Sequence, residues 1–240
     1  MNSFSAIVHT ISFMALPLLV AMVFHEYAHG WVANYFGDST ARDQGRLTLN
    51  PLAHIDLFGT IIMPLLCLLA PGGFFIGWAK PVPITPSRLF HPRRDMAFVA
   101  AAGPAMNLAL ALASGFLLSF LLFIDPTLTA NWPPRPGMMP REDLLGMVLL
   151  PLAAMALYSI FINILLMVFN LIPIPPLDGG RILTSVLPFG AARALSQLEP
   201  YGMLIILLLI MFDPQIHVIH TILGTVVQVL AGSILTGIVL

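Results

Sequence analysis

The fold is decided by residues 11–30, ISFMALPLLVAMVFHEYAHG, in which an apolar run ends in two histidines and a glutamate. Before His25, Ser12 is the one polar side chain in this stretch. An ionisable side chain at membrane depth is costly and by default indicates function. The combination of a hydrophobic span with His25, Glu26 and His29 therefore predicts chemistry carried out within a membrane.

The composition of the whole chain agrees with a membrane location. Of its 240 residues, 58% are hydrophobic and 9% are charged, and the mean hydropathy is +0.94. These values are typical of integral membrane proteins rather than of soluble domains. The net charge is −1 and the ten Lys and Arg residues are scattered, which excludes a basic surface for nucleic acid. We therefore expect a lipid bilayer, and no nucleic acid, around the chain.

Apolar stretches occur at about residues 5–35, 57–76, 97–124, 147–172, 200–212 and 215–240. A helix needs about 20 apolar residues to span a bilayer. The second stretch contains Pro64 and ends in Pro-Gly-Gly, which suits a segment that enters the membrane and returns. The sequence thus predicts an all-α polytopic membrane protein with about five transmembrane helices plus one re-entrant segment.

The distribution of basic residues favours the same topology. Short cytoplasmic loops collect Lys and Arg. If residues 57–76 span the membrane, the basic residues divide six against four; if they return, eight lie on one side and only Arg135 and Arg141 on the other. The second arrangement places the amino terminus outside. The sequence alone leaves open whether residues 57–76 cross.

The spacing of the histidines indicates a metal site. His25 and His29 are four residues apart, so on a helix they lie on one face and both can bind one ion. Glu26 is offset from that face and can reach a metal-bound water as general base, which is the physical content of the H-E-x-x-H pattern. The alternative interpretation is a pair of buried, hydrogen-bonded histidines on a packing face.

A catalytic zinc site has three protein ligands and an open position, so one more ligand is expected. The best candidate is Asp178 in residues 170–181, NLIPIPPLDGGR, because this stretch follows a fully apolar span. Its three prolines prevent a regular helix, and irregular backbone at membrane depth must be buried in protein or line a watery cavity. In the alternative interpretation, Asp178 caps a helix that starts near Gly179.

The topology and the ligand set depend on each other. For Asp178 to meet His25 and His29 at one depth, their segments must run parallel, which requires an odd number of crossings between them. One crossing, residues 97–124, results if residues 57–76 are re-entrant, and two result if they span. The metal site therefore favours the re-entrant segment, as does the charge distribution.

Four motifs together resemble the site-2 protease family of intramembrane zinc metalloproteases over about residues 15–185. They are HEYAHG (25–30), GWAKPVPI (77–84), AGPAMNLALA (102–111) and NLIPIPPLDGGRIL (170–183). The resemblance implies a three-helix catalytic core in which a Pro-broken helix carries the L-D-G motif. The absence of a PDZ or other regulatory module is similar to the short bacterial members, which implies the bacterial cytoplasmic membrane, with the site toward the cytoplasmic face.

The resemblance also implies a domain organisation. We expect one membrane-embedded peptidase domain over residues 1–240. Its catalytic core would occupy about residues 5–188, and an accessory hydrophobic hairpin about residues 199–240.

Residue roles follow from matching motif positions. The resemblance assigns one zinc ion per chain to His25, His29 and Asp178, and acid/base catalysis to Glu26. Asn170 and Asn107 match positions that face the substrate and line the core; each amide could bond a substrate carbonyl or developing oxyanion, or instead another helix. His54 is expected to be a structural or gating residue rather than a fourth ligand.

The implied function is zinc-dependent hydrolysis of a peptide bond within or near a transmembrane helix of a membrane-protein substrate. Two alternatives stay open: a membrane zinc-binding or transport protein, and a homologue that binds membrane helices without cutting them. A transporter predicts several metal-binding groups along a path, whereas this sequence offers one cluster. Neither the identity of the substrate nor the oligomeric state is indicated.

Overall fold

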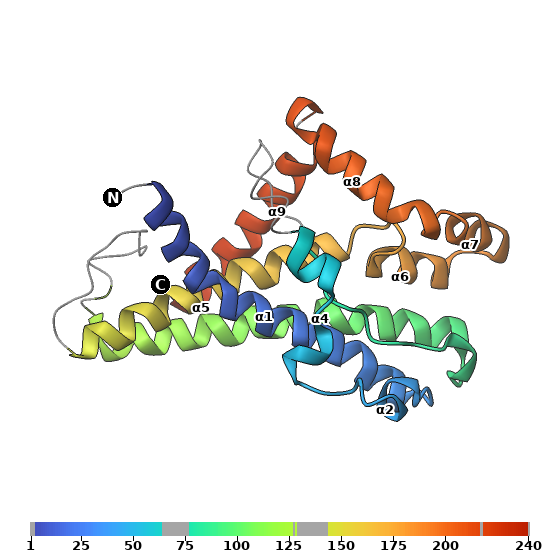
Figure 1. The fold of residues 1–240 in the computed structure, drawn as a ribbon, viewed down its shortest axis with the longest axis horizontal. Coiled ribbons are helices and arrows are strands. Elements are labelled where there is room, and N and C mark those ends of the chain that lie inside the picture. Colours follow the sequence, from blue (N-terminus) through green and yellow to red (C-terminus); the bar gives the residue numbers. More distant parts are fainter. Residues whose placement is uncertain (1–2, 64–76, 127, 129–143, 217, 240) are drawn as a thin grey trace. The chain divides into compact units, whose positions relative to one another are not determined.

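The computed structural model describes residues 3–63, 77–126, 128, 144–216 and 218–239, with the main helices labelled in Figure 1. No strand occurs in these residues. The prediction of an all-α protein is confirmed for this part of the chain.

Long apolar helices make up most of the described chain. They are α1 (Ser3–Tyr35), α4 (Pro92–Ile124), α5 (Leu144–Asn170), α8 (Glu199–Ile216) and α9 (Val218–Ile234). Helices α1, α4 and α5 each contain one internal proline, which is tolerated in membrane helices because neighbouring groups satisfy the freed carbonyls.

Shorter elements connect the long helices. They are α2 (Thr40–Asp43), α6 (Asp178–Val186), α7 (Phe189–Ser196) and the single turns η1 (Pro51–His54), η2 (Leu57–Ile62), η3 (Pro86–Arg88) and η5 (Leu235–Val239).

Two helices in the described residues are long and apolar enough to cross a membrane, Pro92–Ile124 and Gly146–Asn170. A third crossing is counted if Phe189–Ser196 and Glu199–Leu209 act as one bent span. The chain therefore has helices that fit a membrane protein, while the predicted number of five spans stays a prediction.

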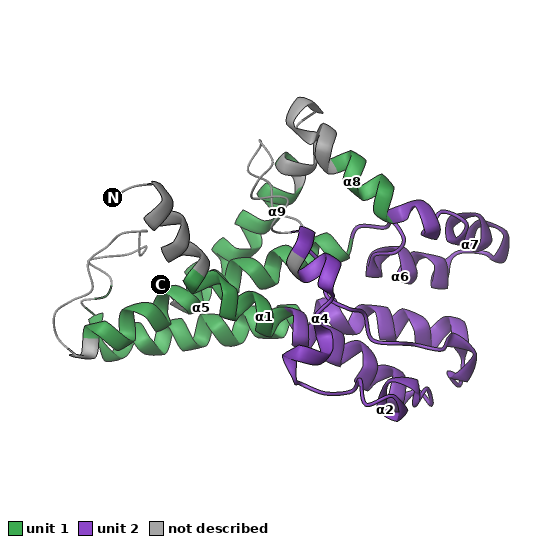
Figure 2. Cartoon of the chain, viewed as in Figure 1, with its two compact units in different colours: residues 1–21, 107–171, 203–240 green, residues 22–106, 172–202 purple. Residues whose placement is uncertain are grey.

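The chain forms two compact units, coloured separately in Figure 2. The first contains residues 1–21, 107–171 and 203–240, and the second contains residues 22–106 and 172–202. This division cuts the chain differently from the predicted core and hairpin, and the single peptidase domain stays a prediction.

The first unit has an apolar core in which α5 packs against α9. Its fully buried side chains include Leu118, Leu128, Ile160 and Ile164. A chain of polar groups runs through the same unit: the Asn107 Nδ2 donates to Asn163 Oδ1 at 2.9 Å, Asn163 Nδ2 to the Ser159 carbonyl at 2.9 Å, and Ser114 to Ser159 Oγ at 2.8 Å. These bonds connect α4 to α5 as polar side chains commonly do inside membranes.

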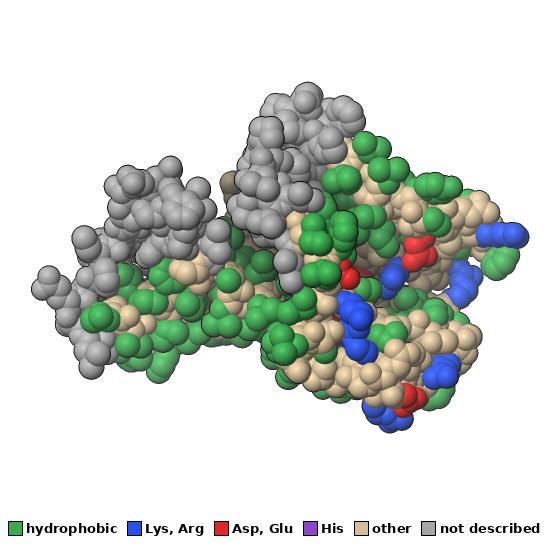
Figure 3. Space-filling view, in the orientation of Figure 1, with side chains coloured by type: hydrophobic (Ala, Val, Ile, Leu, Met, Phe, Trp, Pro, Cys, Tyr) green, Lys and Arg blue, Asp and Glu red, His purple; other side chains and the backbone are tan. Residues whose placement is uncertain are grey.

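The two units differ in charge. Every Lys and Arg side chain that the structure describes belongs to the second unit, and Asp125 is the one described acidic side chain in the first. The charged side chains visible in Figure 3 accordingly lie over the unit that Figure 2 shows in purple. Both units expose large apolar side chains, but those of the first unit, including Phe116, Phe120, Phe123, Met147 and Val148, have no described Lys or Arg in the same unit. An uncharged apolar surface of this kind is typical of contact with lipid.

The start of the predicted re-entrant stretch contacts Trp78, which follows the stretch in the sequence, and both belong to the second unit. The Trp78 N–H donates to the Gly59 carbonyl at 3.2 Å, and Thr60 Oγ1 donates to the Trp78 carbonyl at 2.9 Å. A Cβ added to Gly59 would lie 2.4 Å from the Trp78 ring, so the indole packs on the bare backbone there. Residues 64–76 lie outside the described residues, but the residues on either side of them are hydrogen-bonded to each other.

Candidate metal centre

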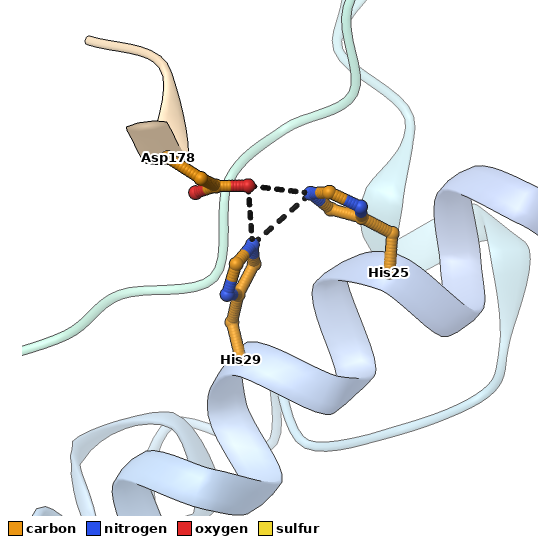
Figure 4. Close-up of side chains that lie close together, drawn as sticks. All are labelled: His25, His29 and Asp178. Atoms are coloured by element: carbon orange, nitrogen blue, oxygen red, sulfur yellow. Dashed lines mark hydrogen bonds and ion pairs between the residues drawn. The ribbon is translucent and has the colours of Figure 1, made fainter. Parts of the chain in front are cut away.

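The three predicted metal ligands converge in the second unit. His25 and His29 lie one turn apart on α1, and Asp178 is the first residue of α6. Figure 4 shows the two imidazoles and the carboxylate pointing toward one point. All three side chains are buried, and no other group of three or more His, Cys, Asp or Glu residues that could hold a metal occurs in the described parts of the chain.

The three facing atoms form a nearly regular triangle. His25 Nε2 lies 3.0 Å from His29 Nε2, and Asp178 Oδ2 lies 3.2 Å from His25 Nε2 and 3.3 Å from His29 Nε2. Tetrahedral zinc with ligands about 2.0–2.1 Å away separates those ligands by about 3.3 Å. The triangle therefore has the size of one face of a tetrahedral zinc site.

The protonation of His29 can be inferred from its second contact. Its Nδ1 lies 2.7 Å from the Val99 carbonyl oxygen, and a carbonyl only accepts hydrogen bonds, so Nδ1 carries the proton. In the neutral ring, Nε2 then presents a lone pair to the centre of the triangle. An outer hydrogen bond of this kind fixes the tautomer of many metal-binding histidines.

Asp178 supplies the strongest indication that a cation belongs here. Its Oδ2 is buried and has no hydrogen-bond donor among the described residues. A buried, unsatisfied carboxylate oxygen costs free energy unless a positive group compensates it. A proton on one imidazole could satisfy only one side of the triangle, whereas a metal ion would satisfy all three atoms.

The capping interpretation of Asp178 is wrong. Helix α6 begins at Asp178, its N-cap residue is Leu177, and no side chain makes a capping hydrogen bond. The carboxylate turns toward the histidines instead of toward its own helix. This result removes the main structural alternative for Asp178.

Two glycines let the proline-rich loop before α6 pack closely. A Cβ on Gly180 would lie 2.3 Å from the Pro175 nitrogen, and one on Gly202 would lie 1.7 Å from the Pro175 carbonyl oxygen. Within the loop, the Leu177 N–H donates to the Ile174 carbonyl at 3.0 Å. Gly180, the last residue of L-D-G-G, therefore lets the start of α6 lie against the Ile174–Pro175 backbone, next to Asp178.

Gly103 of α4 lies directly against the two imidazoles of the triangle. A Cβ at this position would lie 2.5 Å from both His25 Cε1 and His29 Nε2. Only a hydrogen atom fits between the α4 backbone and the two rings. The α4 backbone at this position therefore packs directly against both imidazoles.

Glu26 lies beside the triangle rather than in it. Its Oε2 accepts a hydrogen bond from the Val82 N–H at 2.8 Å, while Oε1 has no partner among the described residues. Its side chain is half-buried. The predicted offset of Glu26 from the two histidines is present, and one carboxylate oxygen is available for proton transfer.

His54 lies outside the metal group. It is buried, its Nε2 lies 2.8 Å from the Thr48 carbonyl oxygen, and its own carbonyl accepts from the Lys80 N–H at 2.9 Å. These contacts fit the structural role that the sequence allowed. A gating role stays a prediction.

Asn107 and Asn170 belong to the first unit, so their expected roles at the site stay predictions. Asn107 is fully buried and bonds Asn163 of α5, which is the helix-to-helix role left open for it. Asn170 Nδ2 donates to the Leu166 carbonyl of its own helix at 3.0 Å, and its second amide hydrogen has no partner in the described residues.

Sequence reasoning missed three residues that the structure makes prominent. Gly103 was detectable as a Gly-Pro pair inside an apolar span, where a close approach of another group is a common reason for glycine. Val82 was detectable as a single N–H donor between two prolines. Asn163 is an isolated amide in the apolar run SIFINILL, the same signal that identified Asn107.

Comparisons with known proteins agree with this site. Residues 13–212 match peptidase family M50. The chain is 38% identical over 202 residues to the Bacillus subtilis (strain 168) protein named "Putative zinc metalloprotease YwhC", covering 82% of this chain and 79% of that protein. It is 30% identical to "Putative zinc metalloprotease Rip2" of Mycolicibacterium smegmatis, covering 80% of this chain and 64% of the relative. No solved structure matches the chain significantly.

Proposed function

Because the chain belongs to peptidase family M50, the site-2 protease family, and is thereby a zinc metalloprotease, we propose that it cleaves membrane-protein substrates within the bilayer. The bond cut would lie within or near a transmembrane helix of the substrate. One observation carries the proposal: the triangle formed by His25, His29 and Asp178 lies in a predominantly apolar chain, with Glu26 beside it.

Each residue of the site has a separate role in the proposed reaction. His25, His29 and Asp178 would hold the zinc ion, which when bound would supply Lewis-acid activation of the peptide carbonyl and of the attacking water. Glu26 takes a proton from the attacking water and passes it to the leaving amine. The proton is carried on Oε1, because Oε2 is bonded to the Val82 N–H.

A substrate helix must unwind locally before its backbone can be attacked, and an added strand is one way to hold it. Residues 77–85 have no regular secondary structure and belong to the second unit, as does the metal group. Four N–H groups of residues 77–85 already donate to other groups, which leaves those of Gly77, Ala79 and Ile84 for a substrate among the described residues. The loop at 172–177 contains three prolines, and its Ile174 and Leu177 N–H groups bond within the loop, so it offers fewer donors. We therefore assign substrate pairing to residues 77–85.

The proposed topology has five spans, an external amino terminus and a re-entrant segment at residues 57–76, with the site near the cytoplasmic face of a bacterial membrane. The contact of Gly59 and Thr60 with Trp78 supports it. Between those contacts there are too few residues to cross a bilayer twice, since each crossing needs about 20. The eight basic residues of the second unit would then share one side.

A reporter fused near Arg88 is expected to report the cytoplasm. The reason is that a segment that returns keeps residues 42–94 on one side, together with Arg181 and Arg193, as the positive-inside rule favours. Two fusions at this position are compared, one to a reporter enzyme that is active only in the cytoplasm and one to a reporter enzyme that is active only outside the membrane. A signal from outside the membrane at Arg88 would refute the re-entrant topology.

Glu26→Gln is expected to slow cleavage by about 10²–10⁴-fold, the usual contribution of a general base. The amide keeps the shape of the side chain but cannot take the proton. Wild type and variant are purified, loaded with equal zinc, and compared on a panel of single-span substrates. Equal zinc content excludes loss of metal as the cause.

Either of two results would contradict the protease proposal. One is equal cleavage by the wild type and Glu26→Gln, and the other is no cleavage of any substrate by the wild type. Zinc flux across vesicles that contain the protein would instead identify a transporter. Binding of substrate helices without cutting would identify a non-catalytic homologue.

A further inference from the structure

We propose that the backbone N–H of Val82 is a positioning group for Glu26. It donates a hydrogen bond to Oε2 of the carboxylate, and this bond orients Oε1 for proton transfer. The inference rests on the proposed function of Glu26 as acid/base. It makes the segment Lys80–Ile84 part of the catalytic machinery rather than only an edge for the substrate.

Between Lys80 and Ile84, this segment has a single backbone N–H that can bind Glu26. Val82 lies between Pro81 and Pro83, and proline has no N–H. Val82 is therefore the single backbone donor between Lys80 and Ile84, and it is directed to Glu26 Oε2 at 2.8 Å. The flanking prolines also favour extended backbone at Lys80 and Val82, which fixes the direction of that donor.

Val82 is fixed on α1 by its side chain as well. It is buried, and its Cγ1 would lie 2.9 Å from a Cβ added to Gly30. Gly30 thus leaves a space into which Val82 packs, one turn after Glu26 on the same helix. The amide and the side chain of Val82 both contact the helix that carries the histidines.

The rest of the segment is held at both ends. The Thr85 N–H donates to the buried Asp38 Oδ2 at 2.6 Å, and the Lys80 N–H donates to the His54 carbonyl at 2.9 Å. Arg46 Nη2 donates to the Lys80 carbonyl at 3.0 Å. A donor anchored on both sides can hold a flexible glutamate in one rotamer, which is what precise catalytic geometry requires.

The contact can be tested without measuring proteolysis. Val82 is the one valine in the sequence that follows a proline. Labelling proline carbonyls with ¹³C and valine nitrogens with ¹⁵N therefore gives a single carbonyl-to-amide NMR signal from the full chain in detergent micelles. Glu26→Ala should move the Val82 amide proton upfield, while Glu199→Ala, at an exposed acid, should not. An unmoved signal in Glu26→Ala would overturn the proposal.

Kinetics test whether the contact positions Glu26. Val82→Pro removes the N–H and is expected to lower kcat by about 10–100-fold, with KM within about twofold of wild type and one zinc per chain. Val82→Ala keeps the N–H and should lower kcat much less. A raised KM with unchanged kcat would show a docking role only, and loss of zinc together with kcat would show a purely structural role; each overturns the proposal.

The failure of this inference differs from failure of the proposed function. A wild-type protein that cuts no substrate overturns the proposed function, and the NMR comparison still decides whether Glu26 binds Val82. Cleavage that is normal in Val82→Pro overturns the positioning role and leaves the proposed function intact.

Discussion

Asp178→Asn is expected to leave the protein without zinc and without peptidase activity. The amide has the size of the carboxylate but no charge, and it is a poor zinc ligand. Zinc bound by four ligands in small peptides gains about 10–16 kcal/mol, or about 2.5–4 kcal/mol for each ligand. The zinc affinity should therefore fall by about 10²–10³-fold, and the measurement is competition with a chromophoric chelator.

Asp95→Asn is the matched control. Asp95 is also fully buried and in the first turn of a helix, but it accepts from the His91 N–H at 2.7 Å and from Arg94 Nε at 3.0 Å. Its substitution should lower the thermal stability and keep the zinc affinity. If Asp178→Asn binds zinc as tightly as Asp95→Asn does, the triangle is not the metal site.

The sequence could predict the ligands because each leaves a local signal. His25 and His29 are recognisable from helical spacing, and Asp178 from an acid among prolines after an apolar span. Such signals depend on the chemistry of one short segment. They do not depend on knowing which helices are neighbours.

The rest depends on contacts between segments far apart in the sequence. The Val99 carbonyl that fixes the tautomer of His29 is 70 residues away, and the Val82 amide that holds Glu26 is 56 residues away. Every residue has a backbone carbonyl, so Val99 carries no distinguishing signal at all. The number of spans is equally hard to predict, because a short, proline-containing apolar stretch has similar composition whether it crosses or returns.

Gly103→Ala is expected to abolish zinc binding although it replaces no ligand. The new methyl group would lie 2.5 Å from His25 Cε1 and from His29 Nε2, far inside the 3.5–4.0 Å at which carbon atoms normally touch. Both rings must move, and the triangle of donor atoms is lost. Changes beside a metal site typically lower the affinity by about 10–100-fold, and displacing two ligands together should reach at least the upper end of that range.

Gly224→Ala separates this clash from the general effect of losing a helical glycine. Gly224 lies within α9, and a Cβ there would meet nothing within 4 Å. Alanine stabilises a helix interior by about 1 kcal/mol relative to glycine, although the proline that follows Gly103 disfavours helical backbone at a residue with a Cβ. Zinc should be lost in Gly103→Ala alone, measured as metal per chain and by chelator competition. Equal zinc binding by the two variants would contradict the close packing of α4 on the histidines.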